Sequence, residues 1–172
     1  GVRLTEADEG RTVTVPAGSE NLVVNGGIGD DSVTVTGTGG PALTVLGSGP
    51  AASDTLTVNT GGSDATVTPG NNSHSGSVST GGDTTQFEGV EGVTIDADGN
   101  AIELDVPGTN AANDITVAPS GANVTVSVDD RALVTFTNFD DASTVDVDAR
   151  GGDDQIEVTP IDGVDVDVDG GP

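Results

Sequence analysis

Short segments in which apolar and polar residues alternate recur along the whole chain, and many follow a turn rich in glycine and acid. The clearest unit spans residues 25–36, N-G-G-I-G-D-D-S-V-T-V-T, in which Val33 and Val35 alternate with threonines. This alternation predicts a strand with one buried and one exposed face. Tight turns favour glycine because they require positive φ angles. The sequence therefore predicts a turn followed by a short strand, repeated many times.

The predicted strands are numerous. They are centred near Leu4, Val13, Val23, Thr34, Thr44, Thr57, Val67, Val78, Phe87, Thr94, Glu103, Thr116, Thr125, Thr135, Val145, Glu157 and Asp165. Alternate centres lie roughly 20 residues apart, and no helical periodicity is present. This spacing predicts an all-β fold over residues 1–172, a single parallel β-helix or β-solenoid domain with roughly 20-residue coils. Valines of successive coils would stack on one another.

The alternative fold is an antiparallel β-sandwich, which also contains many short strands. Sandwich cores usually contain an aromatic cluster, whereas this chain has three phenylalanines and neither Trp nor Tyr. That composition favours the solenoid. Residues 85–91 also resemble residues 134–140, with Phe87 and Phe136 in equivalent places, which indicates a duplicated larger unit. Residues 70–82 form the weakest strand and are expected to protrude as a loop.

The charge and composition of the chain exclude some kinds of partner and predict where the protein is located. The chain has 29 acidic residues and four basic ones, all arginine, which gives a net charge of −25. A nucleic-acid partner is excluded because such partners require a basic surface. Membrane insertion is excluded because no apolar run is long enough. The chain has no cysteine, which is typical of bacterial or archaeal secreted proteins and predicts a secreted or cell-surface location.

One turn matches a known calcium motif. Gly26-Gly27-Ile28-Gly29-Asp30-Asp31-Ser32-Val33-Thr34 fits the nonapeptide G-G-x-G-x-D-x-U-x. Here the chain resembles the RTX family of secreted bacterial proteins, whose parallel β-rolls bind calcium between turns. The resemblance implies that Asp31 is a calcium ligand and that Gly26, Gly27 and Gly29 shape the turn.

Three further acids complete the candidate metal set. Asp30 adjoins Asp31, and Asp54 and Asp154 keep the D-x-U portion of the motif without the leading glycines. Calcium is thus the candidate cofactor, because oxygen ligands are abundant here. The alternative is that Asp31, Asp54, Asp114 and Asp154 cap backbone amides of their own turns.

Outward acids form a second pattern. Glu103 and Asp105, Asp146 and Asp148, and Asp165 and Asp167 are expected to fall in one column of stacked strands, interrupted by Thr125 and Ser127. Like charges one strand apart repel by about 1 kcal/mol even in water. The stability of the fold is therefore expected to depend on cations or salt.

No catalytic residues are predicted. The single histidine, His74, lies in a polar loop and is expected to be solvated, and the paired acids such as Asp129 and Asp130 are adjacent on turns. Acid–base catalysis needs two carboxylates with separated pKa values in a pocket.

The sequence therefore predicts a non-catalytic extracellular structural protein, a β-solenoid module of a surface fibre, adhesin stalk or matrix filament. We expect end-to-end self-association and stabilisation by cations, with cell-surface polysaccharide as a second candidate partner. The chain opens on Gly1 rather than Met, so we expect a mature or excised segment, one module of a longer chain or fibre. Two sequons, at Asn71 and Asn123, would permit glycosylation. The alternative function is a carbohydrate-active β-helix enzyme or its accessory binding domain.

Overall fold

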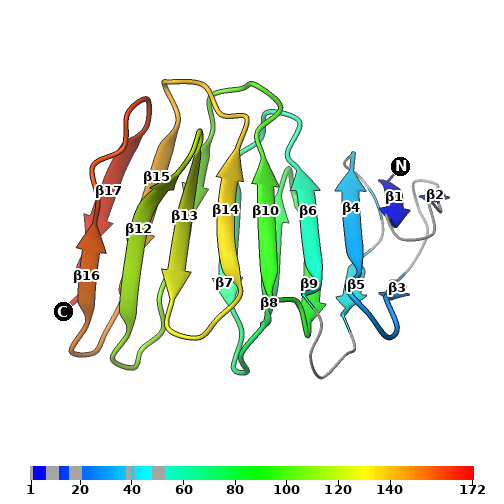
Figure 1. Ribbon diagram of the computed structural model, residues 1–172, viewed down its shortest axis with the longest axis horizontal. Coiled ribbons are helices and arrows are strands. Elements are labelled where there is room, and N and C mark those ends of the chain that lie inside the picture. The colour runs from blue at the N-terminus through cyan, green and yellow to red at the C-terminus, as the bar shows by residue number, and fades with distance from the viewer. Residues whose placement is uncertain (1, 7–11, 16–20, 38–39, 41, 48–52) are drawn as a thin grey trace.

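The computed structural model describes residues 2–6, 12–15, 21–37, 40, 42–47 and 53–172, and within that part the fold is all-β (Figure 1). Sheet A has nine strands in the spatial order β16 (Gln155–Val158), β12 (Asp114–Ser120), β13 (Asn123–Val128), β14 (Leu133–Thr137), β10 (Gly92–Asp96), β6 (Thr55–Asn59), β4 (Ser32–Thr36), β1 (Val2–Glu6) and β2 (Thr12–Val15).

Sheet B has eight strands and lies behind sheet A in Figure 1. Its order is β17 (Asp165–Asp169), β15 (Thr144–Asp148), β11 (Glu103–Asp105), β7 (Ala65–Pro69), β8 (Ser75–Thr80), β9 (Asp83–Glu88), β5 (Leu43–Leu46) and β3 (Leu22–Asn25). Every predicted strand centre lies within one of these seventeen strands. The turn residues and the alternation were therefore sufficient to locate the strands.

The core lies between the two sheets and is mainly aliphatic. Strand β4 shows the predicted alternation, since Val33 and Val35 are 3% and 6% exposed while the threonines beside them point outward. Buried valine, leucine and isoleucine side chains of both sheets form one cluster, to which Phe136 is the largest fully buried contributor. Burial of aliphatic side chains of this kind stabilises a fold by about 1.5–3 kcal/mol each.

Both sheets are mixed. Most neighbouring strands are parallel, such as β4 with β6 and β11 with β15. Antiparallel pairs occur at β1, where it meets β2 and β4, and in two three-stranded meanders, β7-β8-β9 in sheet B and β12-β13-β14 in sheet A. The two predicted folds therefore each account for part of the pairing, because local hairpins are antiparallel and the long-range neighbours are parallel except for β1 with β4.

The prediction that every coil has the same length in the sequence is wrong for much of the chain. Leu22 pairs with Leu43 and Ser32 pairs with Thr55, and the partners in each pair lie one predicted coil apart in the sequence. Where a meander intervenes, the interval nearly doubles, as for Gly92 with Leu133. Because the inserted hairpin is about as long as one coil, a doubled interval resembles two ordinary ones in the sequence.

The predicted duplication of a larger unit matches the strand order. Phe87 lies in β9 and Phe136 lies in β14, and each of these strands ends one of the two meanders. The two meanders belong to opposite sheets. The equivalent segments therefore have the same local structure although they occupy opposite layers.

The expectation of a protruding loop over residues 70–82 is wrong for its second half. Residues 75–80 form β8, which lies inside sheet B between β7 and β9. Val78 of this strand is 1% exposed. The sequence located this strand but underrated it, because Val78 is the one buried residue among the serines and glycine of β8. No helix in the described part of the chain is long and apolar enough to cross a membrane.

Candidate functional site

The turn that carries the calcium-like motif packs its aspartate against its first glycine. Asp31 is 8% exposed. A Cβ atom on Gly26 would lie only 2.5 Å from Asp31 Oδ2, so the turn requires glycine at this place. Gly27 and Gly29 have φ angles of 103° and 114°, which side chains rarely permit. The three glycines are therefore needed for the shape of the turn, whether or not an ion binds there.

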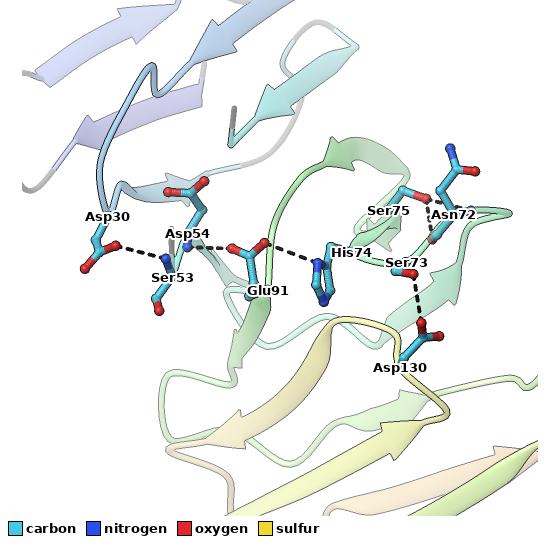
Figure 2. Close-up of polar contacts among 9 residues, drawn as sticks. All are labelled: Asp30, Ser53, Asp54, Asn72, Ser73, His74, Ser75, Glu91 and Asp130. Carbon is cyan, nitrogen blue, oxygen red and sulfur yellow. Dashed lines mark hydrogen bonds and ion pairs between the residues drawn. The ribbon is translucent and has the colours of Figure 1, made fainter. Parts of the chain in front are cut away.

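Equivalent acids in neighbouring turns are joined by hydrogen bonds. Asp54 Oδ1 accepts a 2.7 Å bond from the Asp31 backbone amide. Glu91 Oε2 in turn accepts a 2.7 Å bond from the Asp54 amide (Figure 2). Each of these acids immediately precedes a strand of sheet A, namely β4, β6 or β10. A carboxylate thus caps the backbone of the turn stacked next to it.

Asp30 and Asp154 follow the same rule. Asp30 Oδ1 accepts a bond from the Ser53 amide, and Asp154 Oδ1 accepts a 2.8 Å bond from the Asn113 amide. Asp54 and Asp154 therefore cap backbone amides, as the alternative interpretation of the sequence stated, but the amides belong to adjacent turns rather than to their own. Asp30 does the same. Charge-assisted bonds of this kind are stronger than those between neutral groups.

The structure does not gather the predicted metal ligands around one point. Asp31 and Asp54 lie in adjacent turns, whereas Asp154 lies near the opposite end of sheet A, beside Asn113. Asp54 is 2% exposed and its Oδ2 has no hydrogen-bond partner. A calcium ion at these turns stays a prediction.

The predicted column of outward acids is present on sheet B. Asp105 pairs with Asp146, and Asp146 pairs with Asp167, across β11, β15 and β17. The predicted interruption by Thr125 and Ser127 is wrong, because their strand β13 belongs to sheet A. Counting alternate strands assigned β13 to the wrong layer.

The carboxylates of this column repel one another. Repulsion from Asp105 is the largest cause that raises the pKa of Glu103 above its ordinary value of 4.5, and burial, Asp64, Asp146 and Asp167 add to it. Burial followed by repulsion from Asp105 raises the pKa of Asp146 above 3.8. These shifts mark a surface on which negative charge is destabilising.

Three acids of the column, Glu103, Asp105 and Asp146, are close enough to share a cation. One oxygen from each lies within 4.8 Å of the others, and this is the one such group within the described ranges. Asp105 also accepts a 3.2 Å bond from the Thr66 hydroxyl. Carboxylate oxygens are the ligands that Ca²⁺ and Mg²⁺ prefer. The sequence indicated the column, but not which three acids would converge.

The sequence suggested that His74 is simply solvated, but the structure shows that it also contacts an acid. Its Nδ1 lies 3.2 Å from Glu91 Oε1, within ion-pairing distance when the imidazole is protonated (Figure 2). The adjacent acids Asp129 and Asp130 diverge, since Asp129 accepts bonds from Asn113 and Asp114 while Asp130 accepts one from Ser73. Neither arrangement provides two carboxylates in one pocket.

Comparison of the chain with family models, with curated proteins and with solved structures gave no match.

Proposed function

We propose that the chain is a non-catalytic structural module of an extracellular fibre, adhesin stalk or matrix filament, a β-solenoid that is stabilised by cations and associates with itself end to end. The observation that carries this proposal is the in-register column Asp105–Asp146–Asp167. A protein that displays aligned carboxylates without basic partners gains stability wherever cations are abundant.

The strand order supports the solenoid interpretation. From β3 to β7 the chain alternates between sheet B and sheet A at every strand, and it does so again from β14 to β17. Strands that meet across these turns of chain pair in parallel, with Leu22 beside Leu43 and Thr144 beside Asp165. On this interpretation the two meanders are hairpins inserted into otherwise two-stranded coils.

Self-association is supported by the strands at one end of the stack. In Figure 1, β16 and β17 form the end opposite to β1, β2 and β3. Val158 of β16 and Val168 of β17 are 40% and 42% exposed, although Val117 and Val147, their neighbours in register, are fully buried. A further strand laid on this edge would cover them and would use the free backbone groups.

Two measurements test the proposal. The melting temperature should rise when CaCl₂ replaces NaCl at constant ionic strength, and it should fall again with chelator. Sedimentation at high protein concentration should show association that Val168→Thr weakens. Leu133→Thr is the matched control, since Leu133 is 43% exposed on an outer face rather than at the end of the stack. A melting temperature indifferent to calcium would remove the cation role, and a strictly monomeric wild type would remove self-association.

A further inference from the structure

A polar groove lies on the outer side of sheet B, between the hairpin loop before β8 and strands β5 and β9. Its volume is about 310 Å³, within the range of small-molecule sites. Asn71 and Asn72 of the loop line one side, and Gln86 and Glu88 of β9 and Thr44 of β5 line the other. Nothing in the resemblance to calcium-binding repeats or in the acidic column assigns this groove a role.

The polar side chains that line the groove have unused hydrogen-bonding capacity. Within the described residues, the amides of Asn71, Asn72 and Gln86 and the hydroxyl of Thr44 form no side-chain hydrogen bond. Gln86 is exposed at an outward position of β9, where cross-strand neighbours hold its backbone in place. Free donors and acceptors therefore converge on one space from two separate segments.

The loop that forms one wall is fixed by contacts to distant parts of the chain (Figure 2). The Arg131 guanidinium donates to the carbonyl oxygens of Gly70 and Asn72. The Ser73 hydroxyl donates to Asp130 at 2.9 Å, and His74 pairs with Glu91. These contacts attach the loop, which joins β7 and β8 of sheet B, to the turns before β10 and β14 of sheet A, so its position does not depend on a ligand.

Within the loop, Ser75 fixes the backbone beside the groove. Its hydroxyl donates to the Asn72 carbonyl oxygen at 2.8 Å, and the Gly70 amide donates to the Ser75 carbonyl oxygen, also at 2.8 Å. The side chain of Asn72 is thereby presented from a fixed backbone. A wall that is ordered before binding avoids the entropy cost of ordering it during binding.

The chemistry of the groove selects a neutral, hydroxyl-rich ligand. Amides and hydroxyls both donate and accept, as sugar hydroxyls do. Among the described residues of the lining Glu88 is the only charged one, and a net charge of −25 repels anionic ligands. Phe87 cannot serve as a stacking platform, because it is 4% exposed and its ring lies against Gly76. Hydrogen bonds alone would therefore give weak binding.

We propose that this groove binds a neutral saccharide unit of a glycan. The inference relies on the proposed structural role only for the kind of partner that a surface fibre meets. A cation-stabilised scaffold without glycan binding would leave the proposed function intact. Conversely, saccharide binding by a monomer indifferent to calcium would leave the groove intact.

The test is an NMR titration of the ¹⁵N-labelled chain, read at the side-chain NH₂ resonances of Asn71, Asn72 and Gln86. The probes are cellotetraose, maltotetraose and mannotetraose, with tetragalacturonate as the anionic comparison and tetraglycine as the peptide comparison. At least one neutral tetrasaccharide should shift all three resonances with a single saturation curve, and tetragalacturonate should not. Shifts caused by tetraglycine but by no saccharide, or no saccharide-induced shift up to the solubility limit, would overturn the proposal.

Two variants locate the binding. Gln86→Ala should weaken the saccharide affinity about fivefold, the amount expected for one lost neutral hydrogen bond. Gln155→Ala is the matched control, because Gln155 is also an exposed glutamine on a strand, β16, and lies outside the groove. Unchanged backbone resonances in both variants would show that each still folds. Equal affinity in wild type and Gln86→Ala would place the binding elsewhere and refute the assignment.

Discussion

Neutralising the centre of the acidic column should stabilise the protein. The change is Asp146→Asn, which keeps the shape of the side chain and removes one charge. Asp146 is flanked in register by Asp105 and Asp167, and its carboxylate accepts no hydrogen bond from a described residue. The substitution therefore removes the repulsion between residue 146 and its two neighbouring carboxylates without breaking an attractive contact.

The magnitude follows from the strand spacing. Adjacent strands lie about 4.8 Å apart, at which two unit charges in water repel by about 0.9 kcal/mol. Two such neighbours give a stabilisation of about 1–2 kcal/mol on neutralisation, and the value in water applies because these side chains reach solvent. For a domain of this size each kcal/mol raises the melting temperature by about 2–4 °C. We expect a rise of about 3–6 °C at low salt.

Thermal unfolding followed by circular dichroism, at about 10 mM and at about 1 M NaCl, measures the effect. The rise should nearly vanish at the higher salt concentration, where the Debye length falls to about 3 Å. Asp162→Asn is the control for net charge alone, since Asp162 is exposed in a turn and outside the column. The reasoning is refuted if Asp146→Asn stabilises no more than Asp162→Asn does, or if its effect is independent of salt. Calcium should raise the melting temperature of Asp146→Asn less than that of wild type, because the variant has lost one of the three converging acids.

Two further predictions follow from the same structure. The pKa values of Glu103 and Asp146 are raised in the folded state, so these groups contribute stability below their ordinary values of 4.5 and 3.8 that is lost as the pH rises through the raised values. The melting-temperature advantage of Asp146→Asn should accordingly be largest near neutral pH and shrink toward about pH 4; an advantage that grows in acid would contradict it. Separately, Gly47→Ala should destabilise the fold by about 3 kcal/mol or more, measured by urea unfolding, because its Cβ would lie 1.8 Å from the Gly89 carbonyl oxygen. Gly92→Ala, whose Cβ would meet nothing nearer than Thr55 Cγ2 at 3.6 Å, should cost less than about 1 kcal/mol, and equal losses in the two variants would show that steric contact is not the cause.

The strands could be predicted from the sequence because each is encoded locally. An alternation such as that of Val33 and Val35 determines which face of a strand is buried, whatever its neighbours are. Pairing is not encoded in this way. Strand β13 alternates as regularly as β11 does, yet β13 pairs back on β12 as a hairpin and β11 crosses to the other sheet. Nothing in the alternation distinguishes the two, so layer assignments made by counting strands fail after each hairpin.

The features of the candidate sites likewise divide into those that are encoded within one turn and those that depend on how turns stack. The importance of Gly26 and Asp31 was predictable, because both act within one turn. The bond from the Asp31 amide to Asp54 depends on which turn stacks beside which, and so does the pairing of His74 with Glu91. Acids that meet a backbone amide are stabilised as caps, whereas Asp146, which meets other carboxylates, is not. The sequence places the acids, and only the stacking of turns decides between these outcomes.

The duplicated unit explains how inserted hairpins are accommodated by two facing sheets. Strands β6 to β10 occupy sheets A, B, B, B and A, and strands β11 to β15 occupy B, A, A, A and B. The second unit thus repeats the first with the layers exchanged, which fits the equivalent places of Phe87 and Phe136 in the two meanders. One meander widens sheet B by two strands and the other widens sheet A by two. If both lay in one sheet, that sheet would gain about 19 Å in width over its partner, at about 4.8 Å a strand, and its inward valines would face solvent. Exchange of layers keeps the sheets nearly equal, with nine and eight strands in the described part of the chain, so that one continuous core is covered on both sides.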